Sequence, residues 1–215
     1  MDAIILENVS KKFKEQTVLE PLTISFEKGK IHGIIGNNGS GKTVLFKIIC
    51  GLLLPSTGKV TVNEKVVGKE VDFAPNTGIM IENPSFLSFE SGFRNLKDLA
   101  SIRKKIDDNR IRETIKRVGL DPQDKKRVGK YSMGMRQRLG IAQAIMEDPS
   151  LLVLDEPMNG LDKHGTAEMR KLLLELRDEG KTILIASHIA DDINILCDTV
   201  CEIECGVLTK VKWQK

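Results

Sequence analysis

The sequence lacks a long uninterrupted run of apolar residues. Its longest run covers residues 48–54, seven positions with a glycine among them, whereas a helix that crosses a bilayer needs ~20 apolar residues. Residues 1–7 also lack the basic stretch and the long apolar region of a secretory signal. We therefore expect a chain that does not cross a membrane and that stays in the cytosol.

Cysteine is scarce, with four residues in 215. Cys197, Cys201 and Cys205 are spaced four residues apart, without the CxxC pair or the histidine partners of a zinc site. We interpret the cysteines as small buried residues or as free thiols of a reducing compartment.

The net charge of the chain is also small. Lys and Arg exceed Asp and Glu by 33 − 30, or +3, which does not indicate binding to nucleic acid. The positive charge is concentrated in residues 84–150, where 15 basic and 9 acidic residues give +6 and leave −3 for the rest. Solvated helix faces are the ordinary explanation, and a surface that meets anionic lipid or an acidic partner is the alternative.

The residues that are present have the balance of a soluble globular protein, with 40% apolar and 29% charged. A length of 215 residues suits one α/β domain, or one domain with an insertion, and is short for two full domains. The sequence shows no internal repeat and no low-complexity linker.

Hydrophobic patterning changes twice along the chain. Short strands and turns are predicted up to residue 35, followed by a helix over 42–53 and a mostly helical middle third over 84–146. From Leu151 the pattern alternates between strand and helix, which is typical of a parallel sheet with helices on its faces. The predicted strands are 4–9, 22–26, 31–35, 59–62, 78–81, 151–154 and 182–186, with a helix at 165–179 and a final hairpin around Cys205 and Gly206.

A glycine-rich motif follows directly after the strand predicted at 31–35. It reads Gly36-Asn37-Asn38-Gly39-Ser40-Gly41-Lys42-Thr43 and matches GxxxxGK[ST] in the strand-loop-helix context that the motif requires. Its glycines let backbone N–H groups face phosphates at a helix N-terminus, Lys42 adds a positive charge, and the Thr43 hydroxyl can ligate Mg²⁺. The motif predicts a binding site for a nucleoside triphosphate.

Two carboxylates follow the strand predicted at 151–154. Asp155 and Glu156 then lie at the carboxyl edge of the sheet, where ligands of open α/β folds bind. We expect Asp155 to bind the metal and Glu156 to orient or deprotonate the water that attacks the γ-phosphate. An acidic helix start after a buried strand is the structural alternative.

Between these motifs lies Tyr131-Ser132-Met133-Gly134-Met135-Arg136-Gln137-Arg138. On its own, this segment indicates only a capped helix. Its place after the glycine-rich loop and before Asp155 makes it resemble the signature motif of ATP-binding cassette (ABC) proteins, whose usual form is LSGGQ followed by a basic helix. Tyr131 and Met133 replace the usual Leu and first Gly, while Ser132 and Gly134, which the resemblance places close to phosphate, are retained.

The resemblance covers residues 13–188. It implies that Phe13 stacks on adenine, that Asn159-Gly160-Leu161-Asp162 is the D-loop, with Asp162 at the nucleotide site, and that His188 is the switch histidine. One position departs from the family: Glu82 stands where a glutamine, which reaches Mg²⁺ and the attacking water, is expected. We expect Glu82 to belong to the metal site with Thr43 and Asp155. With residues 81–84, the signature segment is most similar to the bacitracin-resistance and lantibiotic-immunity subgroup of ABC exporters.

The resemblance implies an α/β fold with a P-loop NTPase core. That core has a mostly parallel sheet and an N-terminal antiparallel β-subdomain, and a helical subdomain is inserted into it. We expect a single domain, with the core formed by 1–83 and 147–215 and the helical subdomain by 84–146.

The implied function is Mg²⁺-dependent ATP hydrolysis that powers transport, with export of a peptide antibiotic or similar compound expected. The implied partners are separate permease subunits, bound through residues 82–96, and a second cassette, identical or related, but no nucleic acid. Apolar candidates for the permease contact are Phe86, Leu87, Phe89 and Phe93. The chain would lie on the cytoplasmic face of the cell membrane. The alternatives are a soluble ABC protein that acts on ribosomes or chromosomes, and a P-loop kinase or GTPase.

Overall fold

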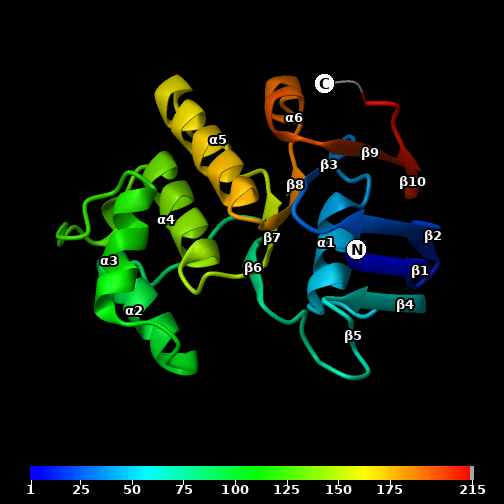
Figure 1. Ribbon diagram of the computed structural model, residues 1–215, viewed down its shortest axis with the longest axis horizontal. Coiled ribbons are helices and arrows are strands. Elements are labelled where there is room, and N and C mark those ends of the chain that lie inside the picture. Colours follow the sequence, from blue (N-terminus) through cyan, green and yellow to red (C-terminus); the bar gives the residue numbers. More distant parts are fainter. Residues whose placement is uncertain (214–215) are drawn as a thin grey trace.

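A six-stranded sheet forms the centre of the structure, a computed structural model that describes residues 1–213 (Figure 1). Its strand order is β10-β9-β3-β8-β7-β6; all neighbouring pairs are parallel except β10 with β9. The strands are β3 (Ile31–Ile35), β6 (Thr77–Met80), β7 (Leu151–Asp155), β8 (Thr182–Ala186), β9 (Thr199–Glu204) and β10 (Val207–Lys210). The prediction of a mostly parallel sheet is confirmed, and the final hairpin turns at Cys205 and Gly206 as expected.

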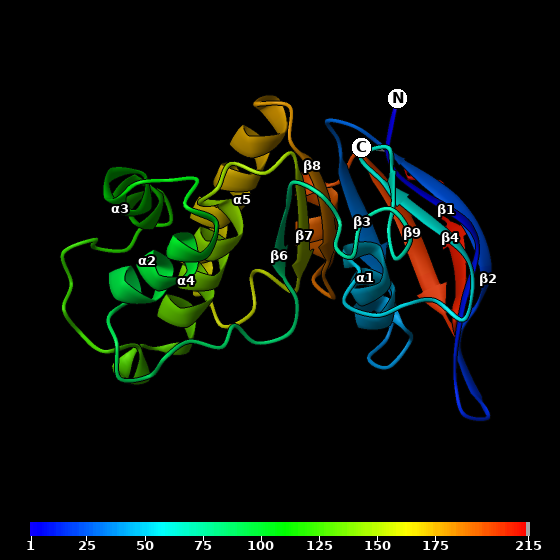
Figure 2. The ribbon, with the colours of Figure 1, turned by 90° about the horizontal axis from the view of Figure 1, so that it is seen from below.

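A second, antiparallel sheet has the order β2-β1-β4-β5. Its strands are β1 (Asp2–Phe13), β2 (Gln16–Glu27), β4 (Thr57–Val62) and β5 (Lys65–Val66). β1 and β2 are longer than the predicted strands 4–9 and 22–26, because their hairpin pairing continues through polar residues to Phe13 and Gln16. Figure 2 shows helix α1 (Lys42–Cys50) between the two sheets.

Helix α1 ends earlier than the predicted 42–53. Gly51 adopts φ 80°, in the left-handed region, and its N–H group bonds to the Lys47 and Ile48 carbonyls. A glycine in this conformation ends a helix at little steric cost.

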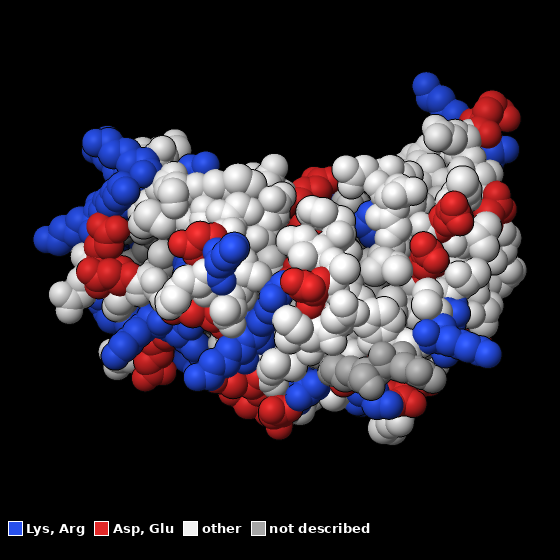
Figure 3. All heavy atoms as spheres, turned by 90° about the horizontal axis from the view of Figure 1, so that it is seen from above, with Lys and Arg blue, Asp and Glu red and all other residues white. Residues whose placement is uncertain are grey.

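Three helices form one end of the molecule, on the left of Figures 1 and 2. They are α2 (Gly92–Arg103), α3 (Asp108–Arg117) and α4 (Met133–Ile145), with a short 3₁₀ turn, η1 (Val128–Lys130), before α4. Ser91, Asp107 and Ser132 cap their N-termini by accepting backbone hydrogen bonds. The mostly helical middle third is confirmed, and Figure 3 shows several Lys and Arg side chains exposed at this end, mixed with acidic ones.

The six-stranded sheet separates two apolar cores. Along β7, Leu152 and Leu154 face the core shared with α4, α5 (Lys163–Asp178) and α6 (Ala190–Leu196), whereas Leu151 and Val153 face α1 and the second sheet. This alternation follows from the two-residue period of a strand. Because both faces are covered, β7 and β8 are buried at every position and their sequences are almost continuously apolar.

The four cysteines, all within residues 1–213, form no disulfide; Cys50, Cys197 and Cys201 are buried and Cys205 is exposed. Burial raises the pKa of Cys50 to about 12 and that of Cys201 to about 11. Of the helices within residues 1–213, none is long and apolar enough to cross a membrane.

Candidate functional site

The candidate site is a cavity of about 380 Å³ at the carboxyl ends of β3, β6 and β7. Open α/β sheets bind their ligands at this edge. The residues that line it are Val18, Asn38, Gly39, Gly41, Lys42, Thr43, Val44, Glu82, Asn83, Gln137, Asp155, Glu156 and Asn159. The cavity therefore brings together residues of the glycine-rich loop, Glu82, which lies two residues beyond β6, and the two carboxylates at the end of β7.

The glycine-rich loop between β3 and α1 requires glycine at two positions. Gly36 has φ 147°, and a Cβ atom there would lie 2.3 Å from the Ile203 carbonyl oxygen. Gly41 has φ 113° and is the N-cap residue of α1. Inside this loop, the buried Ser40 hydroxyl has no hydrogen-bond partner within residues 1–213. A loop that leaves a buried polar group without a partner fits an added ligand with oxygen atoms.

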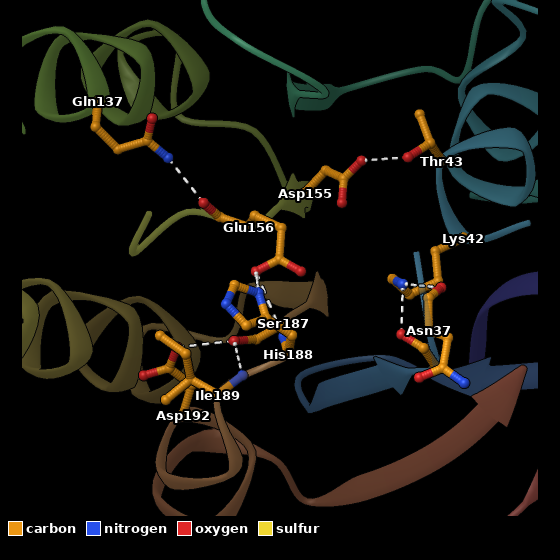
Figure 4. A network of polar contacts seen from close by, with 11 residues as sticks. Asn37, Lys42, Thr43, Gln137, Asp155, Glu156, Ser187, His188, Ile189 and Asp192 are labelled. Atoms are coloured by element: carbon orange, nitrogen blue, oxygen red, sulfur yellow. Dashed lines mark hydrogen bonds and ion pairs between the residues drawn. The ribbon is translucent and has the colours of Figure 1, made fainter. Parts of the chain in front are cut away.

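Lys42 is folded back over this loop. Its Nζ atom donates to the carbonyl oxygens of Gly36, at 2.6 Å, and Asn37, at 2.9 Å (Figure 4). The side chain is 7% exposed, so its charge is held at the cavity wall. An ammonium group in this position can neutralise phosphate oxygens that enter the cavity.

Thr43 and Asp155 provide a pair of oxygen ligands. The Thr43 hydroxyl, in the first turn of α1, donates to Asp155 Oδ2 at 2.7 Å (Figure 4). Asp155 ends β7 and is 7% exposed. A hydroxyl and a carboxylate are the hard ligands that Mg²⁺ prefers, usually with waters and phosphate oxygens as the other ligands. These two residues therefore fit the predicted Mg²⁺ site.

Glu156 and His188 are in direct contact. Glu156 Oε2 lies 2.8 Å from His188 Nδ1, and because a carboxylate can only accept, Nδ1 carries the proton in this contact (Figure 4). Glu156 has φ 51°, in the left-handed region that is costly for a side chain with a Cβ atom. Strained backbone of this kind is concentrated at functional sites.

Two supports of this pair were not predicted from the sequence. Gln137, on α4, is buried and donates from Nε2 to the Glu156 carbonyl oxygen at 2.8 Å. Its place inside the signature-like segment is the one feature of the sequence that could have pointed to a role at the site. The second support is a network of Ser187 with residues of α5 and α6, next to His188.

Ser187 is fixed by a buried ion pair. Its hydroxyl donates to Asp192 Oδ2 at 2.8 Å and accepts from the Ile189 N–H group at 3.1 Å (Figure 4). Asp192 is fully buried, and its other oxygen accepts from Arg170 Nε at 2.8 Å and from Nη2 at 2.5 Å. This network holds the backbone on both sides of His188. No local sequence pattern pairs Arg170 with Asp192.

Seven of the predicted nucleotide contacts do not line this cavity. Three of them, Gly36, Asn37 and Ser40, line a neighbouring cavity of about 610 Å³ that also contains His188 and shares Asn38 and Gly39 with the first.

The other four lie outside the glycine-rich loop. Phe13 lies at the end of β1, is 44% exposed, and has the Lys11 ammonium 4.9 Å from its ring centre. Ser132 caps α4, and Asp162 caps α5 by accepting from the Gly165 N–H group at 2.7 Å. Gly134, in the first turn of α4, is the fourth.

The signature-like segment packs against the predicted D-loop. A Cβ atom on Gly160 would lie 2.5 Å from the Met133 side chain, and one on Gly134 would lie 3.0 Å from the Gly160 carbonyl oxygen. Met133, which departs from the family's glycine, therefore covers the D-loop within the same chain. The roles of Ser132, Gly134 and Asp162 toward a nucleotide stay predictions.

Glu82 follows β6 and lines the cavity. It has φ 61°, and its Oε1 atom lies 2.6 Å from Lys47 Nζ, on α1. Glu82, at the glutamine position of the family, thus lies at the cavity wall with the Lys47 ammonium as its partner. Its role at the metal stays a prediction.

The apolar residues of 82–96 divide into two groups. Phe86 and Phe93 are partly buried against the core of the helical end, and the Arg112 guanidinium lies 4.1 Å from the Phe93 ring centre. Leu87 and Phe89 are 47% and 61% exposed. Only the second group offers apolar surface to another molecule.

A comparison with known families and proteins agrees with this geometry. Residues 19–159 match the family model described as ABC transporter. YybJ of Bacillus subtilis, an uncharacterized ABC transporter ATP-binding protein, is 44% identical over 94% of this chain and 92% of its own length. The bacitracin transport ATP-binding protein BcrA of Enterococcus faecalis is 39% identical over 90% of this chain, which spans 64% of that relative. The lantibiotic transport ATP-binding protein SrtF of Streptococcus pyogenes is 34% identical over 91% of this chain and 84% of its own.

A solved structure has the same fold. The cbiO1 protein of Clostridium perfringens, part of the ABC transporter complex cbiONQ, has a TM-score of 0.81 with this chain and 28% identity, over 97% of this chain and 87% of that one. The family match covers the glycine-rich loop, the signature-like segment and both carboxylates after β7. This chain belongs to the ABC transporter family, among its ATP-binding domains.

Proposed function

We propose that this chain hydrolyses ATP with Mg²⁺ and thereby powers transport through separate membrane-spanning permease subunits. The observation that carries the proposal is the arrangement of Lys42, Thr43, Asp155 and Glu156 around one cavity, with His188 bonded to Glu156. Phosphoryl transfer needs charge neutralisation and a positioned water more than covalent chemistry. These side chains supply both.

Each residue has a distinct role in this proposal. Thr43 and Asp155 would hold Mg²⁺, which when bound neutralises charge on the phosphate oxygens. Lys42 contacts the same phosphates. Glu156 accepts the proton of the attacking water, and His188 holds its carboxylate in place. Phe13, which is 44% exposed, would stack on adenine.

The nucleotide site is incomplete in one chain. Ser132 and Gly134, the signature residues expected at phosphate, do not line the cavity. We infer that they complete the site of a second cassette, identical or related, so that two ATP molecules lie between two subunits. Asp162 would contact the same interface.

Two relatives suggest what is transported. BcrA and SrtF carry names that refer to bacitracin and lantibiotic transport, so the proposed substrate is a peptide antibiotic or a similar compound that is exported. The permease would bind residues 82–96, where Leu87 and Phe89 are exposed, near the proposed junction of the core (1–83 and 147–215) with the helical subdomain (84–146). A subunit bound to such a permease would lie on the cytoplasmic face of the cell membrane.

Purification from membranes tests this proposal against the ribosomal alternative. After solubilisation in detergent, the protein should co-purify with an integral membrane protein, and Phe89→Ser should weaken that association. Ile195→Ser, which changes an exposed apolar residue on α6, is the matched control. Specific cosedimentation with ribosomes or DNA, without a membrane partner, would contradict the transport function.

A further inference from the structure

The cavity contains more negative than positive side chains. Three carboxylates line it, from Glu82, Asp155 and Glu156, whereas Lys42 is the only Lys or Arg among the described residues of the lining. A nucleotide adds further negative charge. Asp155 and Glu156 have assigned roles, and Glu82, expected near the metal, stands where the family has a neutral glutamine. The carboxylate of Glu82 is therefore the one whose charge needs a separate explanation.

Lys47 is placed to offset this charge. Its Nζ atom lies 2.6 Å from Glu82 Oε1, at the distance of a strong, charge-assisted hydrogen bond. Lys47 lies on α1 and Glu82 lies two residues beyond the end of β6, 35 positions away in the sequence. The contact therefore depends on the fold and not on local helix spacing.

One face of α1 supplies both contacts. Thr43 and Lys47 are four residues apart, so they lie on the same side of the helix. Thr43 bonds to Asp155 at the end of β7, and Lys47 bonds to Glu82 after β6. The two strands are neighbours in the sheet. The ammonium thus lies beside the cavity, one helical turn beyond the metal ligand.

We propose that Lys47 is a positioning residue for Glu82. Its ammonium neutralises the carboxylate and holds it toward α1, so that the Lys47–Glu82 pair presents no net charge to an incoming Mg²⁺–nucleotide. A neutral glutamine at position 82 would give the same charge balance without a partner. The inference rests on the proposed function, because it assumes that the cavity binds the nucleotide.

The test is a double-mutant cycle on nucleotide affinity. The Kd for the non-hydrolysable ATP analogue AMPPNP with Mg²⁺ is measured by calorimetry for the wild type, Lys47→Met, Glu82→Gln and the double variant. Lys47→Met should weaken binding about three- to fivefold, the size expected for one partly exposed ion pair. Glu82→Gln should bind at least as tightly as the wild type. The double variant should bind about as the wild type does, because in neither do positions 47 and 82 carry a net charge. Lys47→Met should cost less affinity in the Glu82→Gln background than in the wild type, because no carboxylate is then released toward the nucleotide.

Three controls separate charge from structure. Lys47→Arg keeps the positive charge and should bind as the wild type does. Lys59→Met removes a lysine from a similarly exposed pair with Glu7, away from the cavity, and should leave the Kd unchanged. The melting temperature of Lys47→Met without nucleotide should stay within about 3 °C of the wild type, because exposed ion pairs contribute little stability. The loss of affinity should also shrink at high salt.

Two results would overturn the inference: unchanged affinity in Lys47→Met, or a loss that persists undiminished when Glu82→Gln is also present. The second result would show that Lys47 acts by some route other than Glu82. A wild-type protein that binds no Mg²⁺–nucleotide would instead overturn the proposed function, and this inference with it.

Discussion

Lys42 is the residue on which charge compensation in the cavity depends. It donates to two carbonyl groups of the glycine-rich loop and is the only Lys or Arg in the described part of the lining. Without its ammonium, the phosphate charge that develops during hydrolysis has one stabilising group fewer.

We expect Lys42→Ala to lower the ATP hydrolysis rate at least about 100-fold. The variant should remain folded, because the side chain lies at the surface of the cavity and not in either apolar core. Steady-state phosphate release measures the rate, and circular dichroism checks the fold. Lys59→Ala serves as control, and activity of Lys42→Ala within tenfold of the wild type would refute the assignment of the loop.

Asp192 is the residue on which the backbone around His188 depends. Its side chain is fully buried and bonds to both Arg170 and Ser187. Removing one member of a buried ion pair leaves the other charge without compensation, which costs much more than losing an exposed pair.

Asp192→Ala should therefore lower the free energy of unfolding by about 3–5 kcal/mol. The matched control is Glu179→Ala, which breaks the more exposed pair with Arg117 and should cost about 0–1 kcal/mol. Urea denaturation of both variants gives the comparison. Equal, small losses would show that the buried pair does not stabilise the fold.

At the scale of elements, local signals predicted much of the structure. β3 and β8 have the predicted bounds because their apolar runs end at a glycine-rich loop and at polar residues. The helical middle third followed from its apolar spacing. The ends of α1, β1 and β2 were wrong, since Gly51 and the hairpin pairing, and not hydrophobicity, decide them.

In the candidate site, too, some residues were predictable from local sequence signals and others were not. The glycine-rich loop, Asp155 and Glu156 were predictable because each follows a strand in a short motif. The contacts of Lys47 with Glu82, of Arg170 with Asp192 and of Gln137 with Glu156 join elements distant in sequence. Such pairs are decided by how helices pack on the sheet, and a single sequence carries no local sign of them.

β3 carries a buried histidine that makes stability depend on pH. Burial is the main cause that lowers the pKa of His32 below its ordinary value of 6.5, and its ring nitrogens bond to Thr199 Oγ1 and the Glu27 carbonyl oxygen. The folded state therefore favours the neutral ring. As pH falls below 6.5, the unfolded chain binds a proton that the folded chain resists, so stability falls.

We expect His32→Gln to reduce the loss of stability between about pH 6.5 and pH 5, relative to the wild type. Asn109→Gln, which changes an exposed residue that does not titrate, should leave the pH profile as it is. Urea denaturation across this pH range measures both. A profile that is the same for His32→Gln and the wild type would contradict the contribution of His32.

At the scale of the whole molecule, the proposed nucleotide site needs a second subunit. The cavity holds the glycine-rich loop and the carboxylates, while the signature-like segment packs on the D-loop outside it. A nucleotide bound between two such subunits would favour the dimer by mass action. Hydrolysis of that nucleotide would then allow the two subunits to separate.

The most direct test of this account is the mass of Glu156→Gln in light scattering after size exclusion. The substitution keeps the shape of the side chain but removes the carboxylate that accepts a proton, so ATP should stay bound between subunits. We expect twice the monomer mass of 23.9 kDa with ATP and Mg²⁺, and the monomer mass with ADP. A variant that remains a monomer with ATP and Mg²⁺, and that shows no nucleotide binding in the same buffer, would contradict both the site and the pairing.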